Sequence, residues 1–273
     1  MDSKQGIHIH QLIVAVDPGI IRLGLAIGEI DIDIPFRSRA SNEDDCIINE
    51  SDYRNRTETE LVLEFVKWHC ACTLNLMLMV SDCAVEGCLL HHSNEMVDRV
   101  DHLLQLFPIF LTCDWLLIER QQPGACTDVQ NLLMKICDRS KILLMAANSR
   151  NKYIGAVKGM DRMQRKRITV MRVLRWMCAR ALQQGFWNVQ QWCEMCEMQH
   201  VLLTPVIVDQ LVEDCHDAAD SLLFIAMHLK QKIWEQIIKQ IQAHNQRIRN
   251  EQARKMNPDE FFNQFRHSSR LTV

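Results

Sequence analysis

The sequence predicts an α/β fold, with a mixed β-sheet flanked by helices, a helical insertion and a long C-terminal helix. Two observations indicate this fold class. Short apolar, mostly β-branched runs end in polar turns, as buried strands do. Longer stretches carry apolar residues at three- and four-residue steps, as amphipathic helices do. The first runs follow one another as antiparallel strands, and the later runs are separated by helices, which is typical of layered α/β proteins.

The composition is that of an ordinary globular protein. The chain has 273 residues, of which 48% are hydrophobic and 24% charged. Because its net charge is −3, a surface that binds nucleic acid would have to be a local patch of basic residues. Twelve cysteines are too few for a disulfide scaffold at this length. The N-terminus resembles neither a signal nor a transit peptide, and no apolar run reaches the ~18 residues of a membrane span. We therefore expect a single domain over 1–273 in a reducing intracellular compartment, the cytoplasm or the nucleus.

The first third of the chain predicts strands, a loop and helices. We expect strands over 12–16, 23–30 and 34–39, and a polar, acidic loop over 41–57. From Glu58 the apolar residues recur at helical spacing, and a second helix is expected over 94–106, before Pro108. Residues 41–112 together form the predicted helical insertion.

The rest of the chain alternates strands and helices. We expect strands over 115–118 and 142–146, and helices over 125–138 and 160–183. Residues 184–208 are interpreted as a connection. A long helix begins near Asp217 and extends to about 255, so that 230–273 forms a C-terminal extension with a short tail after 256.

Four carboxylates occupy the ends of these apolar elements. Asp17 follows the strand Leu12-Ile13-Val14-Ala15-Val16 and precedes Pro18-Gly19, and Glu119 follows the strand Trp115-Leu116-Leu117-Ile118. Asp217 and Asp220 are spaced i, i+3, which places both on one face at the first turn of the last helix. Each also has a structural explanation, because aspartates cap turns and acids favour helix N-termini.

If these acids converge, they need cations. Four carboxylates in a small volume repel one another unless positive charge lies among them. Oxygen ligands suit Mg²⁺, with Mn²⁺ as a substitute. Two such ions about 4 Å apart activate a water and stabilise the leaving oxygen of a phosphodiester. The hypothesis is therefore a two-metal hydrolytic site.

A basic segment provides a candidate nucleic-acid surface. Over 150–180 ten cations face the single acid Asp161, which favours a phosphate-binding surface over a merely solvated helix face. The candidate DNA contacts are Lys152, Lys158, Arg162, Arg165, Lys166 and Arg167.

Cysteine pairs are weaker candidates. Cys193-x-x-Cys196 with His200 has zinc-like spacing, but no second pair completes four ligands, and ordinary thiols are the favoured interpretation. Two other groups are weaker still as metal sites: Cys70 with Cys72, and Cys83 and Cys88 with His91-His92.

The acidic motifs resemble those of RuvC-type Holliday junction resolvases, which belong to the RNase H-like superfamily. The resemblance rests on Val16-Asp17-Pro18-Gly19 with Gly24, on Leu117-Ile118-Glu119, and on Asp217-Ala218-Ala219-Asp220-Ser221-Leu222, which matches a DAADA-type motif almost letter for letter. Residues 151–159 resemble the family's lysine- and glycine-containing segment that approaches DNA. The match covers about 10–40, 113–175 and 210–230.

The resemblance implies an RNase H-like fold and a Mg²⁺-dependent endodeoxyribonuclease of DNA recombination and repair. Its catalytic, metal-binding tetrad would be Asp17, Glu119, Asp217 and Asp220, with two ions per site. A homodimer, paired through the helix at 125–138, would nick two opposed strands of a four-way junction. Larger members occur in mitochondria and large DNA viruses, and the N-terminus and the Cys- and Met-rich composition favour a viral enzyme in a host cell.

Three alternatives remain open. The first is a flap or branched-DNA endonuclease without junction symmetry. The second is an actin- or hexokinase-like ATP-binding protein, because Asp17-x-Gly19-x₄-Gly24 resembles their phosphate loop, although the chain has only nine glycines and no Gly-Gly pair. The third is a binding module that has lost catalysis, which the presence of all four acids disfavours.

Overall fold

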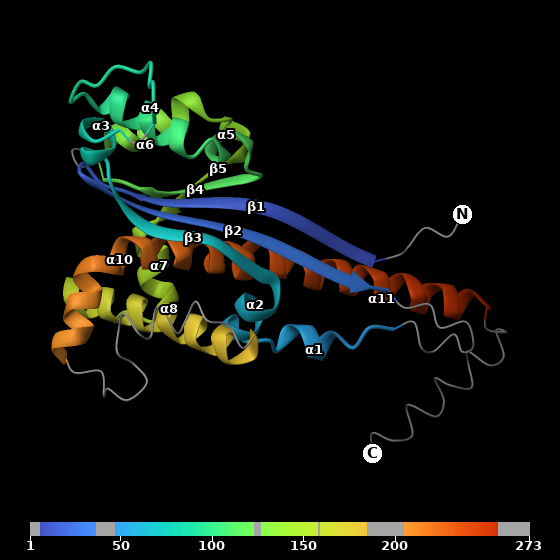
Figure 1. Ribbon diagram of the computed structural model, residues 1–273. Coiled ribbons are helices and arrows are strands. Elements are labelled where there is room, and N and C mark those ends of the chain that lie inside the picture. Colours follow the sequence, from blue (N-terminus) through green and yellow to red (C-terminus); the bar gives the residue numbers. More distant parts are fainter. Residues whose placement is uncertain are drawn as a thin grey trace. The chain divides into compact units, whose positions relative to one another are not determined.

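A computed structural model describes residues 6–36, 47–83, 85–122, 127–157, 159–184 and 205–255 (Figure 1). The chain divides into two compact units. The larger comprises Ile9–Asp31 and Glu58–Gln231, and the smaller comprises Met1–His8, Ile32–Thr57 and Lys232–Val273. All the candidate site residues that the structure describes belong to the larger unit.

The fold is built on a mixed sheet in the order β3-β2-β1-β4-β5. Its strands are β1 (Gly6–Pro18), β2 (Arg22–Pro35), β3 (Val66–Asn75), β4 (Trp115–Arg120) and β5 (Ile142–Ala146). A short turn joins β1 to β2, and β2 pairs with β3 antiparallel, whereas β1–β4 and β4–β5 are parallel pairs. The predicted mixed α/β sheet is confirmed.

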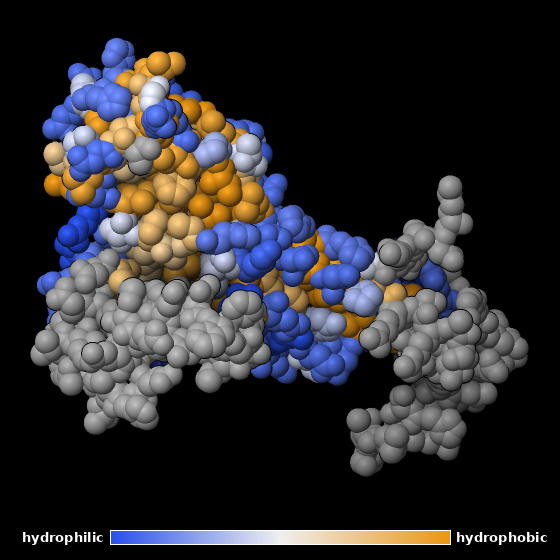
Figure 2. Space-filling view, in the orientation of Figure 1, coloured by the Kyte–Doolittle hydropathy of each residue, from blue (hydrophilic) through white to orange (hydrophobic). Residues whose placement is uncertain are grey.

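Helices cover both faces of the sheet in the larger unit. On one face lie α4 (Met96–Leu106), α5 (Ile109–Thr112) and α6 (Thr127–Ile136), with the short α3 (Leu78–Ser81) beside them (Figure 1). Alternate residues of β1, β2 and β4 form one apolar core with α4 and α6. Figure 2 shows apolar surface over this layer, and its exposed large apolar side chains include Val97, Leu106, Leu111 and Ile136.

The other face carries the helices that bear most of the candidate site. These are α2 (Glu58–Phe65), α7 (Ala147–Tyr153), α8 (Arg162–Gln184) and α10 (Pro205–His228) (Figure 1). The helix α10 packs against β3 and against α8. The expected helices over 94–106, 125–138 and 160–183 and the strands over 115–118 and 142–146 are all present.

The helix predicted from Glu58 ends early. Only α2 is helical, and residues 66–75 form strand β3 instead. The spacing of Phe65, Trp68 and Cys72 matches a helix, but β2 offers an unpaired edge that hydrogen-bonds this segment along its length. Tertiary pairing therefore overrides local periodicity here.

Two further boundaries differ from expectation. Residues 50–54, inside the predicted loop, form helix α1 (Glu50–Arg54), whose N-cap Asn49 accepts from the backbone N–H of Ser51. The last helix begins at Pro205, so the predicted connection ends there, and Asp217 and Asp220 lie in its middle rather than at its first turn. Helix-dipole chemistry therefore does not explain these two acids.

The C-terminal helix is as long as predicted. The helix α10 continues through a π-helical segment η3 (Leu229–Trp234) into α11 (Glu235–Lys255). In the smaller unit, α1 lies against α11, where the Asn245 side chain donates to Ile48 O (2.8 Å) and accepts from Ile48 N (2.9 Å). In the described part of the chain, no helix is long and apolar enough to cross a membrane. The expected strand beyond Phe36 and the tail after Lys255 lie outside the described residues.

Candidate active site

Asp17 and Glu119 are neighbours because their strands are parallel and in register. Val16 of β1 lies opposite Ile118 of β4, so the next residue of each strand is an acid at the same carboxyl edge of the sheet. Ligand sites in α/β sheets form at this edge. The Pro18-Gly19 turn is tight, since a Cβ at Gly19 would lie 2.3 Å from the Arg22 carbonyl oxygen.

Helix α10 brings the other two acids to this edge. It crosses β2 at Gly24, where an added Cβ would lie 2.1 Å from the Asp217 carbonyl oxygen. Only glycine permits this approach, and the Ser221 hydroxyl donates to the same carbonyl (3.1 Å). Asp217 and Asp220, one helical turn apart, consequently face the ends of β1 and β4 across one cleft of about 720 Å³. The structure thus brings all four predicted acids together.

Arg150 lies among the acids. It belongs to α7, which follows β5 at the same edge of the sheet. Its Nη1 donates to Asp220 Oδ2 at 2.6 Å, and lies 3.2 Å from Glu119 Oε1 and 3.9 Å from Asp17 Oδ2. One guanidinium therefore forms ion pairs with three buried carboxylates.

The charge in the cleft is not balanced. Burial raises the pKa of Asp17 well above its usual range, and the adjacent Glu119 carboxyl raises it further by hydrogen bonding and repulsion. Burial also raises the pKa of Asp220 to about 6, although Arg150 beside it favours the carboxylate. These shifts are those of crowded acids that lack sufficient positive charge.

Asp217 is different because a histidine contacts it and basic side chains lie nearby. Burial acts to raise its pKa, but the hydrogen bond and charge of His216, with Lys166 and Arg22 nearby, lower it overall. His216 Nε2 lies 2.7 Å from Asp217 Oδ1, and its Nδ1 lies 2.7 Å from the Val212 carbonyl oxygen, to which it can only donate. Adjacent residues of a helix usually face apart, yet the side chains of His216 and Asp217 contact each other here.

His216 Nε2 has two competing partners. The Lys166 ammonium, which only donates, contacts the same nitrogen as the Asp217 carboxylate, which only accepts. A proton on Nε2 directs the ring to Asp217, and its loss makes Nε2 an acceptor for Lys166.

The predicted DNA contacts divide into two groups. Arg162, Arg165 and Lys166 of α8 line the same cleft as the acids, together with Arg22. Lys152 is exposed on α7, and neither it nor Arg167 lines the cleft. Lys158 lies outside the described residues, as do Cys193, Cys196 and His200.

Two later arginines of the basic segment, Arg172 and Arg180, make structural contacts within the fold. Arg172 donates to the Tyr153 carbonyl oxygen (3.1 Å) and pairs with Glu58 (3.6 Å), and Arg180 donates to the Val66 carbonyl oxygen. The phosphate-binding hypothesis therefore applies to the first turns of α8 only.

Arg150 was missed in the sequence as a contributor to the cleft. It was counted only as one basic residue among ten, although its position just after β5 is a signal for the carboxyl edge. Arg120 and Gln121 directly follow Glu119 and were expected to contact substrate, but Gln121 has a different role. Gln121 holds Glu119, donating from Nε2 to Glu119 Oε2 (3.3 Å), and its own N–H donates to the buried Gln130 side chain (2.9 Å). Arg120, proposed as a substrate contact beside Gln121, is exposed and does not line the cleft.

The donor set of the cleft suits hard divalent ions. All four acids offer oxygen only, the set that Mg²⁺ and Mn²⁺ prefer. Glu119 Oε1 is buried and has no hydrogen-bond partner, since its contact with Arg150 lacks hydrogen-bond geometry. A ligand atom of this kind is satisfied by a cation. No protein-family model matches the chain, and no curated protein matches it.

Arg150→Gln is expected to destabilise the metal-free protein by about 3–5 kcal/mol, because it leaves buried carboxylates unpaired. Added Mg²⁺ should restore more stability to this variant than to the wild type, since the ions no longer compete with the guanidinium. Thermal unfolding in EDTA and in Mg²⁺ measures both effects. Arg172→Gln, which also breaks a structural ion pair, is the control and should lose stability that Mg²⁺ does not restore. Equal stability of Arg150→Gln and the wild type in EDTA would contradict the assigned role.

Proposed function

We propose that the chain is a metal-dependent endonuclease that resolves four-way DNA junctions, a RuvC-like enzyme of the RNase H-like superfamily. The observation that carries the proposal is the convergence of Asp17, Glu119, Asp217 and Asp220 in one cleft. They come from three separate places in the sequence, two parallel strand ends and one helix face. The five-stranded mixed sheet is in keeping with the RNase H-like fold that the sequence resemblance implies.

The four acids would hold two Mg²⁺ ions. When bound, such ions supply an activated water and stabilise charge on the leaving oxygen of a phosphodiester. Arg150, already beside three of the acids, must shift its contacts when cations enter. His216 is placed to accept or hold a proton at Nε2, within reach of Asp217. Gln121 keeps the Glu119 carboxylate oriented.

The basic residues of the cleft would hold the DNA backbone. Arg162 and Arg165 reach the cleft from the first turns of α8 and line it together with the acids. A phosphate in the cleft would meet both the positive charge of these arginines and the hydrolytic groups. This arrangement favours a phosphodiester over a neutral substrate.

Arg162→Ala combined with Arg165→Ala is expected to weaken junction binding and its salt dependence. Each phosphate contact that is lost should reduce the slope of log K against log salt concentration by about 0.9. Titration of a labelled junction at several salt concentrations measures the slope. Arg175→Ala, an exposed arginine of α8 outside the cleft, is the control and should leave the slope unchanged. An unchanged slope in the double variant would exclude these two arginines as phosphate contacts.

Symmetric resolution requires two copies of the chain. The resemblance assigns the dimer contact to the region of α6, which carries the exposed Ile136 at its end. Sedimentation of the full chain, alone and with a junction, would detect the dimer. Each copy would contribute one complete acidic cleft.

The test of the proposal is a comparison of labelled substrates in Mg²⁺. A four-way junction, a 5′ flap and a linear duplex of matched sequence are incubated with the full chain, and the cut sites are mapped on every strand. Paired nicks at symmetric positions on two opposed strands are expected. Faster cutting of the flap, with unpaired nicks, would favour the branched-DNA alternative. Binding without any cut would favour a module that has lost catalysis.

A further inference from the structure

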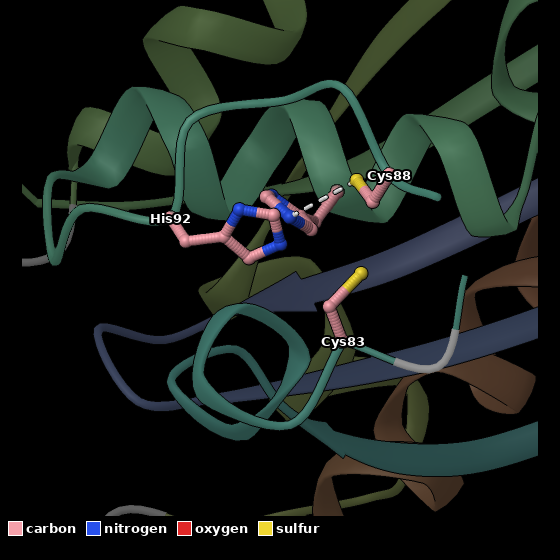
Figure 3. A group of neighbouring side chains, drawn as sticks. Cys83, Cys88 and His92 are labelled. Carbon is pink, nitrogen blue, oxygen red and sulfur yellow. Dashed lines mark hydrogen bonds between the residues drawn. The ribbon is translucent and has the colours of Figure 1, made fainter. Parts of the chain in front are cut away.

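Two cysteines and two histidines of the larger unit form a compact cluster apart from the acidic cleft. Cys83, Cys88 and His92 come from the segment that joins α3 to α4, and His102 comes from α4 itself. None of the four lines the cleft. Figure 3 shows the labelled side chains of Cys83, Cys88 and His92 turned toward a common centre beside α4.

The ligand atoms have the separation of a metal site. One atom from each of the four residues, a sulfur or a ring nitrogen, lies within 4.8 Å of all the others. Cys88 Sγ and His102 Nε2 are 3.8 Å apart. A tetrahedral zinc site with ordinary Zn–S and Zn–N bonds has edges of about 3.3–3.8 Å. Small side-chain rotations therefore suffice to close the cluster around one ion.

The histidine from α4 is already oriented for coordination. His102 is fully buried, and its Nδ1 lies 2.7 Å from the Asp98 carbonyl oxygen. Since a carbonyl only accepts, Nδ1 carries the proton, and Nε2 presents its lone pair to Cys88 and the cluster. A ligating histidine commonly has its second nitrogen fixed in this way.

The segment between α3 and α4 is held on α4 mainly at its end, where Arg99 donates to the carbonyl and the side-chain oxygen of Asn94, and at Cys88, which donates to Gln105. Residues 82–95 contain no helix or strand among those described, and Gly87 takes a positive φ of 69° that permits the turn before Cys88. At its end, the Ser93 N–H donates to the Asp98 side chain (3.0 Å). An ion that joins Cys83, Cys88 and His92 to α4 would fix the whole segment on the helix.

We propose that Cys83, Cys88, His92 and His102 bind one structural zinc ion. Two thiolates and two imidazoles that can surround one ion tetrahedrally are a ligand set that zinc prefers, whereas the oxygen ligands of the acidic cleft suit Mg²⁺. All four protein ligands close the coordination sphere, so the ion has no open position for catalysis. Binding releases the two thiol protons to solvent, and the site stabilises the fold by holding 82–95 against α4.

The test is the zinc content of the full chain, measured by mass spectrometry of the metal after purification without chelators. About one zinc per chain is expected in the wild type and in Cys70→Ser/Cys72→Ser, a control pair on β3. Cys83→Ser/Cys88→Ser should lose the ion. Cys193→Ser/Cys196→Ser should keep it, which separates this site from the other cysteine motif.

Two measurements on the wild type stand independently of whether a variant folds. Cobalt in place of zinc should give the strong visible bands of a tetrahedral thiolate site. A strong chelator should make Cys83 and Cys88 reactive to alkylation and lower the melting temperature. Absence of zinc in the wild type, zinc lost only with Cys193 and Cys196, or octahedral cobalt would each overturn the proposal. None of these outcomes depends on whether the acidic cleft cuts DNA.

Discussion

An Asp17→Asn protein is expected to bind a four-way junction normally and to cut it at least about 1,000-fold more slowly, a loss of about 4 kcal/mol of transition-state stabilisation. The amide keeps the shape of the side chain but removes the charge that would hold divalent ions between Glu119 and Asp220. The substitution leaves the arginines of α8 that line the cleft, the proposed phosphate contacts, unchanged. Single-turnover cleavage and a binding titration measure the two effects separately.

The same variant should not be less stable in EDTA. The pKa of Asp17 is raised by burial and by Glu119, so its ionised form is costly in the metal-free protein, and a neutral amide removes that cost. Asp31→Asn, an exposed aspartate of β2, is the matched control and should cut at the wild-type rate. Normal cutting by Asp17→Asn would show that the tetrad is wrongly assigned.

Gly24→Ala is expected to have the second largest effect, because it acts on stability and on the site together. The added methyl would lie 2.1 Å from the Asp217 carbonyl oxygen and 2.9 Å from Ser221 Oγ. Backbone cannot yield as a flexible side chain does, so α10 must move away from β2 at a cost of about 1–3 kcal/mol or more. Asp217 moves with the helix, and a displacement of about 1 Å is enough to lower the cleavage rate about 100-fold.

Gly28→Ala provides the comparison on the same strand. Its added methyl would meet the Trp68 ring at 3.2 Å and the tip of Ile225 at 3.3 Å, both side chains that can adjust. We expect a smaller loss of stability and near-normal cutting. Chemical unfolding and single-turnover cleavage of both variants give the result. If Gly24→Ala were as stable and as active as Gly28→Ala, α10 would not approach β2 at Gly24 as closely as described.

The sequence predicted the acidic site well because strand ends carry a strong local signal. An apolar run that ends in an acid and a Pro-Gly turn makes Asp17 a candidate, and the similar strand end at Glu119 and the acids of the last helix strengthen it. Neighbouring parallel strands then bring Glu119 to the same edge. The i, i+3 spacing of Asp217 and Asp220 is likewise independent of where the helix begins.

Sequence reasoning failed where partners distant in the chain decide the outcome. Residues 66–75 have helical periodicity, yet they form β3 because β2 presents an edge to them. The position of Arg150 among the acids depends on α7 beginning directly after β5. Cys83, Cys88 and His92 were considered only a weak metal site in the sequence, because the fourth ligand, His102, lies on α4 and was not identified.

The most direct test of the central claim is the binding of Mn²⁺, a paramagnetic substitute for Mg²⁺, to the full chain with zinc supplied. Two Mn²⁺ ions per chain are expected, displaced by Mg²⁺ and lost in both Asp17→Asn and Asp220→Asn but kept in Asp31→Asn. Equal Mn²⁺ uptake by all four proteins, or none by the wild type, would contradict this claim.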